Sequence, residues 1–135
     1  MTDARLELRS PPSDVDDVHD WLEDVWKRHP EVDGEARFAF ETALIELVTN
    51  SIRHGRTASD IRCTVEVDVT ETSLTALLTD TGGPVNLPSV PWGMPDDDES
   101  EGGRGLALIH LLTDSLEYRR AGDRNVWTVR RQTHA

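Results

Sequence analysis

Three polar side chains repeat at four-residue spacing within residues 38–55, which read FAFETALIELVTNSIRHG. Glu46, Asn50 and His54 occupy positions i, i+4 and i+8, so on a helix they stack along one stripe. A carboxamide oxygen is a hard neutral ligand that suits Mg²⁺, and a carboxylate one turn earlier can accept a proton from an attacking hydroxyl. His54 has a structural alternative, which is to bond the last carbonyls of the helix. By itself the stripe favours a simpler interpretation, a solvated helix face with a hydrogen bond between positions i and i+4.

Two glycine-containing motifs follow downstream. Asp80-Thr81-Gly82-Gly83-Pro84 ends an apolar stretch. An Asp in that position can accept a hydrogen bond from an exocyclic amine such as adenine N6, and a glycine lets the backbone approach a flat base. Gly102-Gly103-Arg104-Gly105-Leu106 precedes an apolar helical pattern, and glycines at a helix entrance expose N–H groups that bind phosphate. Each motif alone has a simpler interpretation: an ordinary turn for the first, and an Arg104 that points to water for the second.

The periodicity of apolar residues predicts the elements that carry these motifs. Residues 4–9 and 61–69 alternate in the manner of strands, and residues 74–79 form a second apolar strand. The first helix is expected to begin at a capping box of Ser13 and Asp16 and to end near Pro30, and the central helix to begin at Asp33 or Gly34. A short helix after Gly105 and a last hairpin over residues 116–131 complete the order. This order predicts an α+β two-layer sandwich, with a largely antiparallel sheet and three helices on one face, as a single domain over residues 1–135.

The composition narrows the classes of function. The chain carries 26 acidic against 14 basic residues, for a net charge of −12, which opposes direct binding to nucleic acid or to anionic membranes. Cys63 is the single cysteine, so an internal disulfide and a cysteine-based zinc site are excluded, and a small buried hydrophobe is expected there. No apolar stretch approaches the length of a membrane span, and we expect a cytoplasmic protein.

Taken together and in this order, the three motifs resemble those of the GHKL ATPases (gyrase, the heat-shock chaperone ATPases, histidine kinases and MutL). The stretch ELVTNSIRHG resembles the N box, Asp80-Thr81-Gly82-Gly83-Pro84 the first glycine box, and Gly103-Arg104-Gly105-Leu106 the second. The resemblance covers residues 41–131. The chain has no room for the further domains of the larger relatives, and what remains resembles the free-standing anti-sigma factor serine/threonine kinases of the RsbW and SpoIIAB type.

That resemblance implies a Bergerat ATP-binding fold with ATP and Mg²⁺ as cofactors. Asn50 would coordinate Mg²⁺, Glu46 would be the general base, and Asp80 would bind adenine N6 beside Gly82. The resemblance also implies an ATP lid over residues 85–102. Gly103, Arg104 and Gly105 would contact the phosphates at the far hinge of this lid, and Thr128 would contact the adenine from the last strand. The chain departs from the family in three places. Pro84 replaces the second glycine of the first box, and Asn125-Val126-Trp127-Thr128 stands where Gly-Thr often enters the last strand. The lid is also rich in proline and very acidic.

The resemblance therefore predicts an ATP-binding serine/threonine-protein kinase and anti-sigma factor. It would phosphorylate an anti-anti-sigma (STAS) partner, hold a sigma factor, and form a homodimer as members of that family often do. The alternative is a non-catalytic GHKL-fold regulatory module that sequesters a protein partner with weak or no nucleotide binding. The acidic run at residues 96–99 favours this alternative, because it raises the cost of bringing a phosphate close. An ATPase that transfers phosphate to no protein is a third hypothesis.

Overall fold

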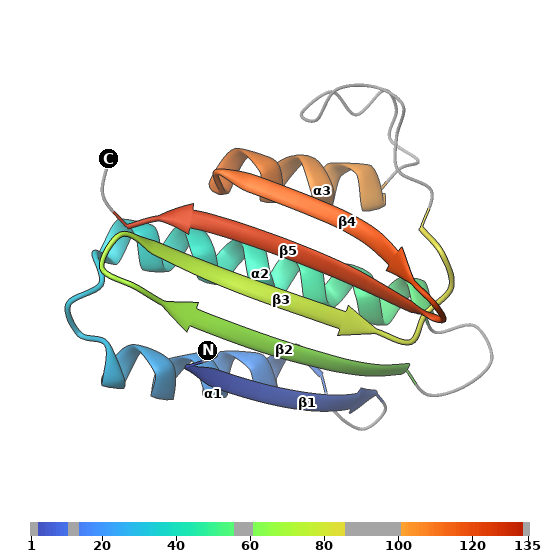
Figure 1. Ribbon diagram of the computed structural model, residues 1–135, viewed down its shortest axis with the longest axis horizontal. Helices are drawn as coiled ribbons and strands as arrows, with labels where there is room; N and C mark the ends of the chain where they lie inside the picture. Colours follow the sequence, from blue (N-terminus) through green and yellow to red (C-terminus); the bar gives the residue numbers. More distant parts are fainter. Residues whose placement is uncertain (1–2, 11–13, 56–60, 86–100, 134–135) are drawn as a thin grey trace.

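The chain folds in the order β1 (Ala4–Ser10), α1 (Val15–Arg28), α2 (Gly34–Gly55), β2 (Ile61–Val69), β3 (Ser73–Asp80), α3 (Glu101–Leu112), β4 (Ser115–Ala121) and β5 (Arg124–Gln132). The structure, a computed structural model, describes residues 3–10, 14–55, 61–85 and 101–133, with the backbone alone at residues 10, 54–55 and 101–105. The strands form one five-stranded sheet in the order β1-β2-β3-β5-β4, and every neighbouring pair is antiparallel. The helices lie on one face of this sheet (Figure 1). The predicted α+β fold class is confirmed.

Alternation along the strands separates a packed face of the sheet from an open one. On β5, Trp127 and Val129 belong to the core, whereas Thr128 between them is half-buried. On β3, Leu74, Ala76 and Leu78 likewise belong to the core. Because side chains of a strand alternate between faces, these core residues define the face that packs against the helices. The largest fully buried side chains include Phe40, Leu44, Leu47 and Val48 of α2, together with Val18, Leu22 and Val25 of α1.

The first helix is capped one residue later than the sequence predicts. Asp14 is the N-cap: its side chain accepts a hydrogen bond from the Asp16 N–H at 2.9 Å, and the Asp17 carboxylate accepts one from the Asp14 N–H at 2.9 Å. The expected pairing of Ser13 with Asp16 is therefore wrong, because Asp14 and Asp17 form the capping box with the same spacing. Ser13 itself lies outside the described residues.

The central helix begins where the sequence predicts. The Asp33 carboxylate accepts a hydrogen bond from the Ala36 N–H at 3.1 Å, and the helix then runs from Gly34 to Gly55. Its first half is fixed to α1 by Trp26, whose Nε1 donates to Glu41 at 2.7 Å. The Trp26 ring also meets the Phe40 ring edge-on, with centroids 6.2 Å apart. These contacts set the orientation of α2 across the sheet.

The third helix begins earlier than expected. It starts at Glu101, so Gly102, Gly103 and Gly105 lie within its first turns instead of preceding it. Glycine costs about 1 kcal/mol in a helix interior, a cost that burial of an apolar face can exceed. Here Leu106 and Ile109 join the core, and α3 packs against α2. Residues 86–100, which contain most of the predicted lid, lie outside the described residues.

Candidate functional site

One row of residues crosses the sheet at the end where β3 finishes and β5 begins. Strand register places Cys63 opposite Asp80, Asp80 opposite Asn125, and Asn125 opposite Arg120. Asp80 and Asn125 are each 2% exposed. The C-terminal end of α2 and the N-terminal end of α3 lie at the same end of the sheet (Figure 1). The three motifs that the sequence separates are thus gathered at one end of the molecule.

Asp80 presents its two carboxylate oxygens differently. Its Oδ1 accepts the Gly82 N–H at 2.8 Å and the Asn125 Nδ2–H at 2.9 Å. Among the residues that the structure describes, no donor bonds to Oδ2. A buried carboxylate ordinarily uses its full capacity to accept hydrogen bonds, so Oδ2 is suited to a donor from outside the chain.

Asn125 holds the loop that follows Asp80. Its Nδ2 also donates to the Gly83 carbonyl at 2.8 Å and lies 3.4 Å from the Gly82 carbonyl. Its Oδ1 accepts from the Tyr118 hydroxyl and from Arg120 Nη1 at 3.1 Å. The same Nη1 donates to the Gly82 carbonyl at 2.6 Å. The loop at Gly82 and Gly83 is therefore held by side chains from β4 and β5.

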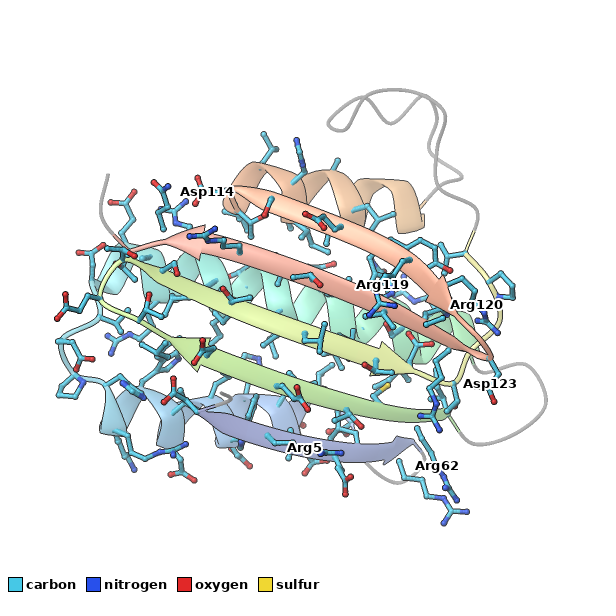
Figure 2. The ribbon with its side chains drawn as sticks, viewed as in Figure 1. Arg5, Arg62, Asp114, Arg119, Arg120 and Asp123 are labelled. Carbon is cyan, nitrogen blue, oxygen red and sulfur yellow. The ribbon has the colours of Figure 1, made fainter. Side chains whose placement is uncertain are left out.

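The edge strand supplies the outer part of this network. Arg120 lies beside the hairpin turn that carries Asp123 (Figure 2), and its Nε donates to the Gly122 carbonyl at 3.2 Å. Tyr118 packs on Trp127 with ring centroids 4.5 Å apart, and its hydroxyl accepts the Val85 N–H at 3.1 Å. The sequence analysis did not predict Asn125, Tyr118 and Arg120 as site residues. The one signal was that Asn125 begins the stretch in which the chain differs from the family pattern at the last strand.

The helical part of the site comes from α2. Glu46 and Asn50 are half-buried on its C-terminal half. Within the described part of the chain, Glu46 has no hydrogen-bonded or ion-paired partner. Asn50 Nδ2 is buried and finds no hydrogen-bond partner in the described ranges. An unpaired amide in such a position costs free energy unless a ligand or water satisfies it. The His54 side chain is not among those that the structure describes.

The structure does not bring Thr128 together with Asp80. Thr128 is paired with Leu77 and Glu117, and it alternates with the core residues Trp127 and Val129. Its side chain therefore lies on the open face, whereas Asp80 and Asn125 lie on the helix face. In this strand Asn125 takes the place beside Asp80. Gly103, Arg104 and Gly105 lie at the start of α3, where the first N–H groups of a helix have no intrahelical partner.

Cys63 lies on β2, opposite Asp80 of β3, and its thiol is unreactive. It is 2% exposed, as the sequence predicts. Burial raises the pKa of its thiol to about 12, and the charge of the neighbouring Asp80 adds to this increase. The thiol therefore stays protonated near neutral pH and is excluded as a nucleophile.

A metal ion at this site would depend on a ligand that brings oxygen atoms of its own. In the described ranges no group of three or more His, Cys, Asp and Glu side chains could hold a metal ion. Within the described residues the buried Nδ2 of Asn50 has no acceptor, which suits a phosphate oxygen. The oxygen of the same carboxamide would be the Mg²⁺ ligand, because Mg²⁺ is commonly held by one or two protein groups together with phosphate oxygens and water. No helix within the described residues is both long enough and apolar enough to cross a membrane.

Comparison with known proteins agrees with this architecture. The family model for the histidine kinase-like ATPase domain matches residues 8–131. Among solved structures, the catalytic domain of histidine kinase ThkA in a nucleotide-free form aligns over 96% of each chain, with a TM-score of 0.53 and 12% identity. The Acinetobacter baumannii histidine kinase AdeS aligns with a TM-score of 0.50 and 20% identity, over 73% of this chain and 48% of its own. The chain thus spans about half the length of AdeS. No curated protein matches.

Fold and family model together define the class. The sheet order, the single helical layer and the match over residues 8–131 are those of a kinase-like ATPase domain of the GHKL superfamily. The chain belongs to the histidine kinase-like ATPase domain family. At these levels of identity the two solved structures support the fold, and the family model carries the assignment.

Proposed function

We propose that this protein is an ATP-binding serine/threonine-protein kinase and anti-sigma factor that phosphorylates an anti-anti-sigma (STAS) partner. The observation that carries the nucleotide site is a pair of unsatisfied polar groups at one end of the sheet. Among the residues that the structure describes, one Asp80 carboxylate oxygen accepts from two donors and the other from none, and the buried Nδ2 of Asn50 has no acceptor. A nucleotide supplies an exocyclic amine for the Asp80 oxygen and phosphate oxygens that can accept from Asn50 Nδ2, and the oxygen of the same carboxamide is a ligand that suits a phosphate-bound Mg²⁺.

The residues support a direct transfer of phosphate to a hydroxyl. The serine or threonine oxygen of the partner would attack the γ-phosphorus, and the new O–P bond would form as the bond to the β–γ bridging oxygen breaks. ADP leaves, and the hydroxyl proton passes to the Glu46 carboxylate. Bound Mg²⁺ would neutralise charge on the phosphates. Asn50 would hold the ion, and the free N–H groups at the start of α3 would face the phosphates. No described residue pairs with the Glu46 carboxylate, so the carboxylate is available to accept a proton from a substrate hydroxyl.

The helical side of the molecule offers a surface for protein partners. Leu108 and Leu111 are 37% and 73% exposed on α3, and Phe38 is 71% exposed on α2. Leu108 and Leu111 are three residues apart on α3 and are therefore neighbours on the helix surface, and contiguous exposed apolar side chains are typical of binding surfaces. The specific partners, a STAS protein and a sigma factor, rest on the resemblance of the sequence motifs to anti-sigma factor kinases.

The alternative is a regulatory module that sequesters a partner without catalysis. The same exposed apolar residues favour it, because a binding surface of this kind needs no nucleotide. The two functions differ in what they require of Glu46, whose carboxylate serves only the chemical step.

A phosphotransfer assay separates the two functions. Purified protein, MgATP labelled at the γ-phosphate and a candidate STAS protein are incubated, and label on the STAS protein is measured for the wild type, Glu46→Gln and Glu35→Gln. Glu35 is an exposed carboxylate in the first turn of the same helix and serves as the matched control. We expect Glu35→Gln to behave as the wild type and Glu46→Gln to lose at least about 100-fold in rate, the range of general base catalysis. Equal rates in both variants would contradict the role of Glu46, and partner binding without any labelling would favour the non-catalytic module.

A further inference from the structure

We infer that Asn125 is a positioning residue, which fixes the Asp80 carboxylate for the base of a nucleotide and, through Tyr118, joins this site to Val85. The inference rests on the proposed function for the nature of the ligand and goes beyond it by assigning roles to Asn125 and Tyr118, which the sequence motifs do not include. The remainder of the network consists of Arg120 and the carbonyls of Gly82 and Gly83.

The hydrogen-bonding capacity of Asn125 is fully used. A carboxamide has two N–H donors and an oxygen with two lone pairs. In this structure the donors go to Asp80 Oδ1 at 2.9 Å and to the Gly83 carbonyl at 2.8 Å. The oxygen accepts from Tyr118 and from Arg120. A side chain that is 2% exposed and satisfied at every atom is held in one orientation, because each alternative leaves a buried polar group unpaired.

This orientation decides which carboxylate oxygen is available. Asn125 and the Gly82 N–H occupy Oδ1, so Oδ2 is the acceptor that remains. An acceptor at a fixed position favours a base with an exocyclic amine over one with a carbonyl at the same place, because two facing acceptors repel. Asn125 therefore contributes to the choice of base without needing to touch it.

Tyr118 extends the network toward the segment that follows the first glycine box. Its hydroxyl donates to Asn125 and accepts the Val85 N–H at 3.1 Å, and Val85 is the last described residue before that segment. A single hydroxyl thus joins the residue that orients Asp80 to the backbone at Val85. Loss of this hydroxyl leaves the ring packing on Trp127 unchanged while removing both hydrogen bonds.

The test compares two nucleotides that differ at one position of the base. Inosine triphosphate carries a carbonyl oxygen where ATP carries the N6 amine. The dissociation constants of both Mg²⁺ complexes are measured by calorimetry for the wild type, Asn125→Ala, Tyr118→Phe and the control Gln132→Ala. Gln132 is an exposed amide at the far end of the same strand.

We expect the wild type and Gln132→Ala to prefer ATP, and Asn125→Ala to lose about tenfold or more of that preference, the effect of about 1.4 kcal/mol. A merely structural role of Asn125 would weaken the binding of both nucleotides equally and leave the ratio of their dissociation constants unchanged. If Asn125→Ala fails to fold, Tyr118→Phe tests the same network. We expect it to reduce the preference and to speed hydrogen exchange at the Val85 amide, which a role limited to ring packing would not change.

The outcomes separate the inference from the proposed function. A wild type that binds neither nucleotide overturns both. The inference alone is overturned if the wild type prefers ATP and Asn125→Ala keeps the same ratio of dissociation constants. It is likewise overturned if Tyr118→Phe changes neither that ratio nor the rate of hydrogen exchange at the Val85 amide.

Discussion

Replacement of Asp80 by asparagine changes one atom at the centre of the proposed site. The new side chain keeps an oxygen that can accept from the Gly82 N–H and from Asn125 Nδ2, so the loop should keep its conformation. Its second atom becomes an NH₂ group in place of Oδ2, which turns an acceptor into a donor. The substitution therefore leaves the internal network in place and reverses the polarity offered to the base.

The expected magnitude follows from the hydrogen bond that is lost. A hydrogen bond to a charged group contributes about 1.5–3 kcal/mol, so Asp80→Asn should weaken MgATP binding by about 10- to 100-fold. The same change should favour a base with a carbonyl at that position, and we expect MgITP to bind this variant more tightly than MgATP does. The control is Asp123→Asn, which makes the same change of charge at a turn where the side chain is 92% exposed.

Calorimetric titration of both nucleotides into the three proteins measures these effects, with thermal denaturation as the check on folding. Asp123→Asn should match the wild type. If Asp80→Asn stays folded and binds MgATP within about twofold of the wild type, below the smallest loss expected for such a hydrogen bond, Asp80 does not contact the base.

Three further predictions concern the scaffold and are checked by urea denaturation. Phe40→Ala removes a fully buried side chain and should cost about 3–5 kcal/mol, whereas Phe38→Ala, at a position 71% exposed on the same helix, should cost less than about 0.5 kcal/mol; similar losses in both would contradict the assigned faces of α2. Asp14→Ala should cost about 1 kcal/mol through loss of the N-cap, and no loss would contradict the capping box. The raised pKa of Cys63 means that its contribution to stability is fully present below its ordinary value of 9.0 and is lost as the pH rises toward about 12, so the wild type should weaken relative to Cys63→Ala above pH 9.0; parallel pH profiles would contradict this.

The layers of the fold follow directly from the sequence. Alternation over residues 61–69 and the apolar spacing of α2 identify elements by a periodicity that burial of one face imposes. Ends of elements are less determined by local pattern. Asp14 and Ser13 offer the same capping chemistry one residue apart, and the early start of α3 depends on how far its apolar face packs against α2.

The candidate site was predictable only in part, because sequence spacing does not fix the register in which the strands pair. The stripe of Glu46 and Asn50 lies within one helix, where spacing alone fixes the geometry. The row that joins Asp80 to Asn125 and Arg120 depends on how β3 pairs with β5 and β5 with β4, which are tertiary contacts. A shift of one residue in that pairing exchanges the two faces of a strand. Thr128 lies an odd number of residues after Asn125 in the same strand, so alternation places it on the open face.

The most direct test of the nucleotide site is calorimetric titration of ATP, with and without Mg²⁺, into the wild type and into Asn50→Ala. A carboxamide at Asn50 that holds the phosphate-bound Mg²⁺ through its oxygen, together with the available oxygen of Asp80, predicts binding to the wild type that requires Mg²⁺ and falls by at least about tenfold in the variant. Binding of equal strength in both proteins would contradict the assignment of Asn50. The absence of binding to the folded wild type would contradict the nucleotide site itself and would favour the partner-sequestering module.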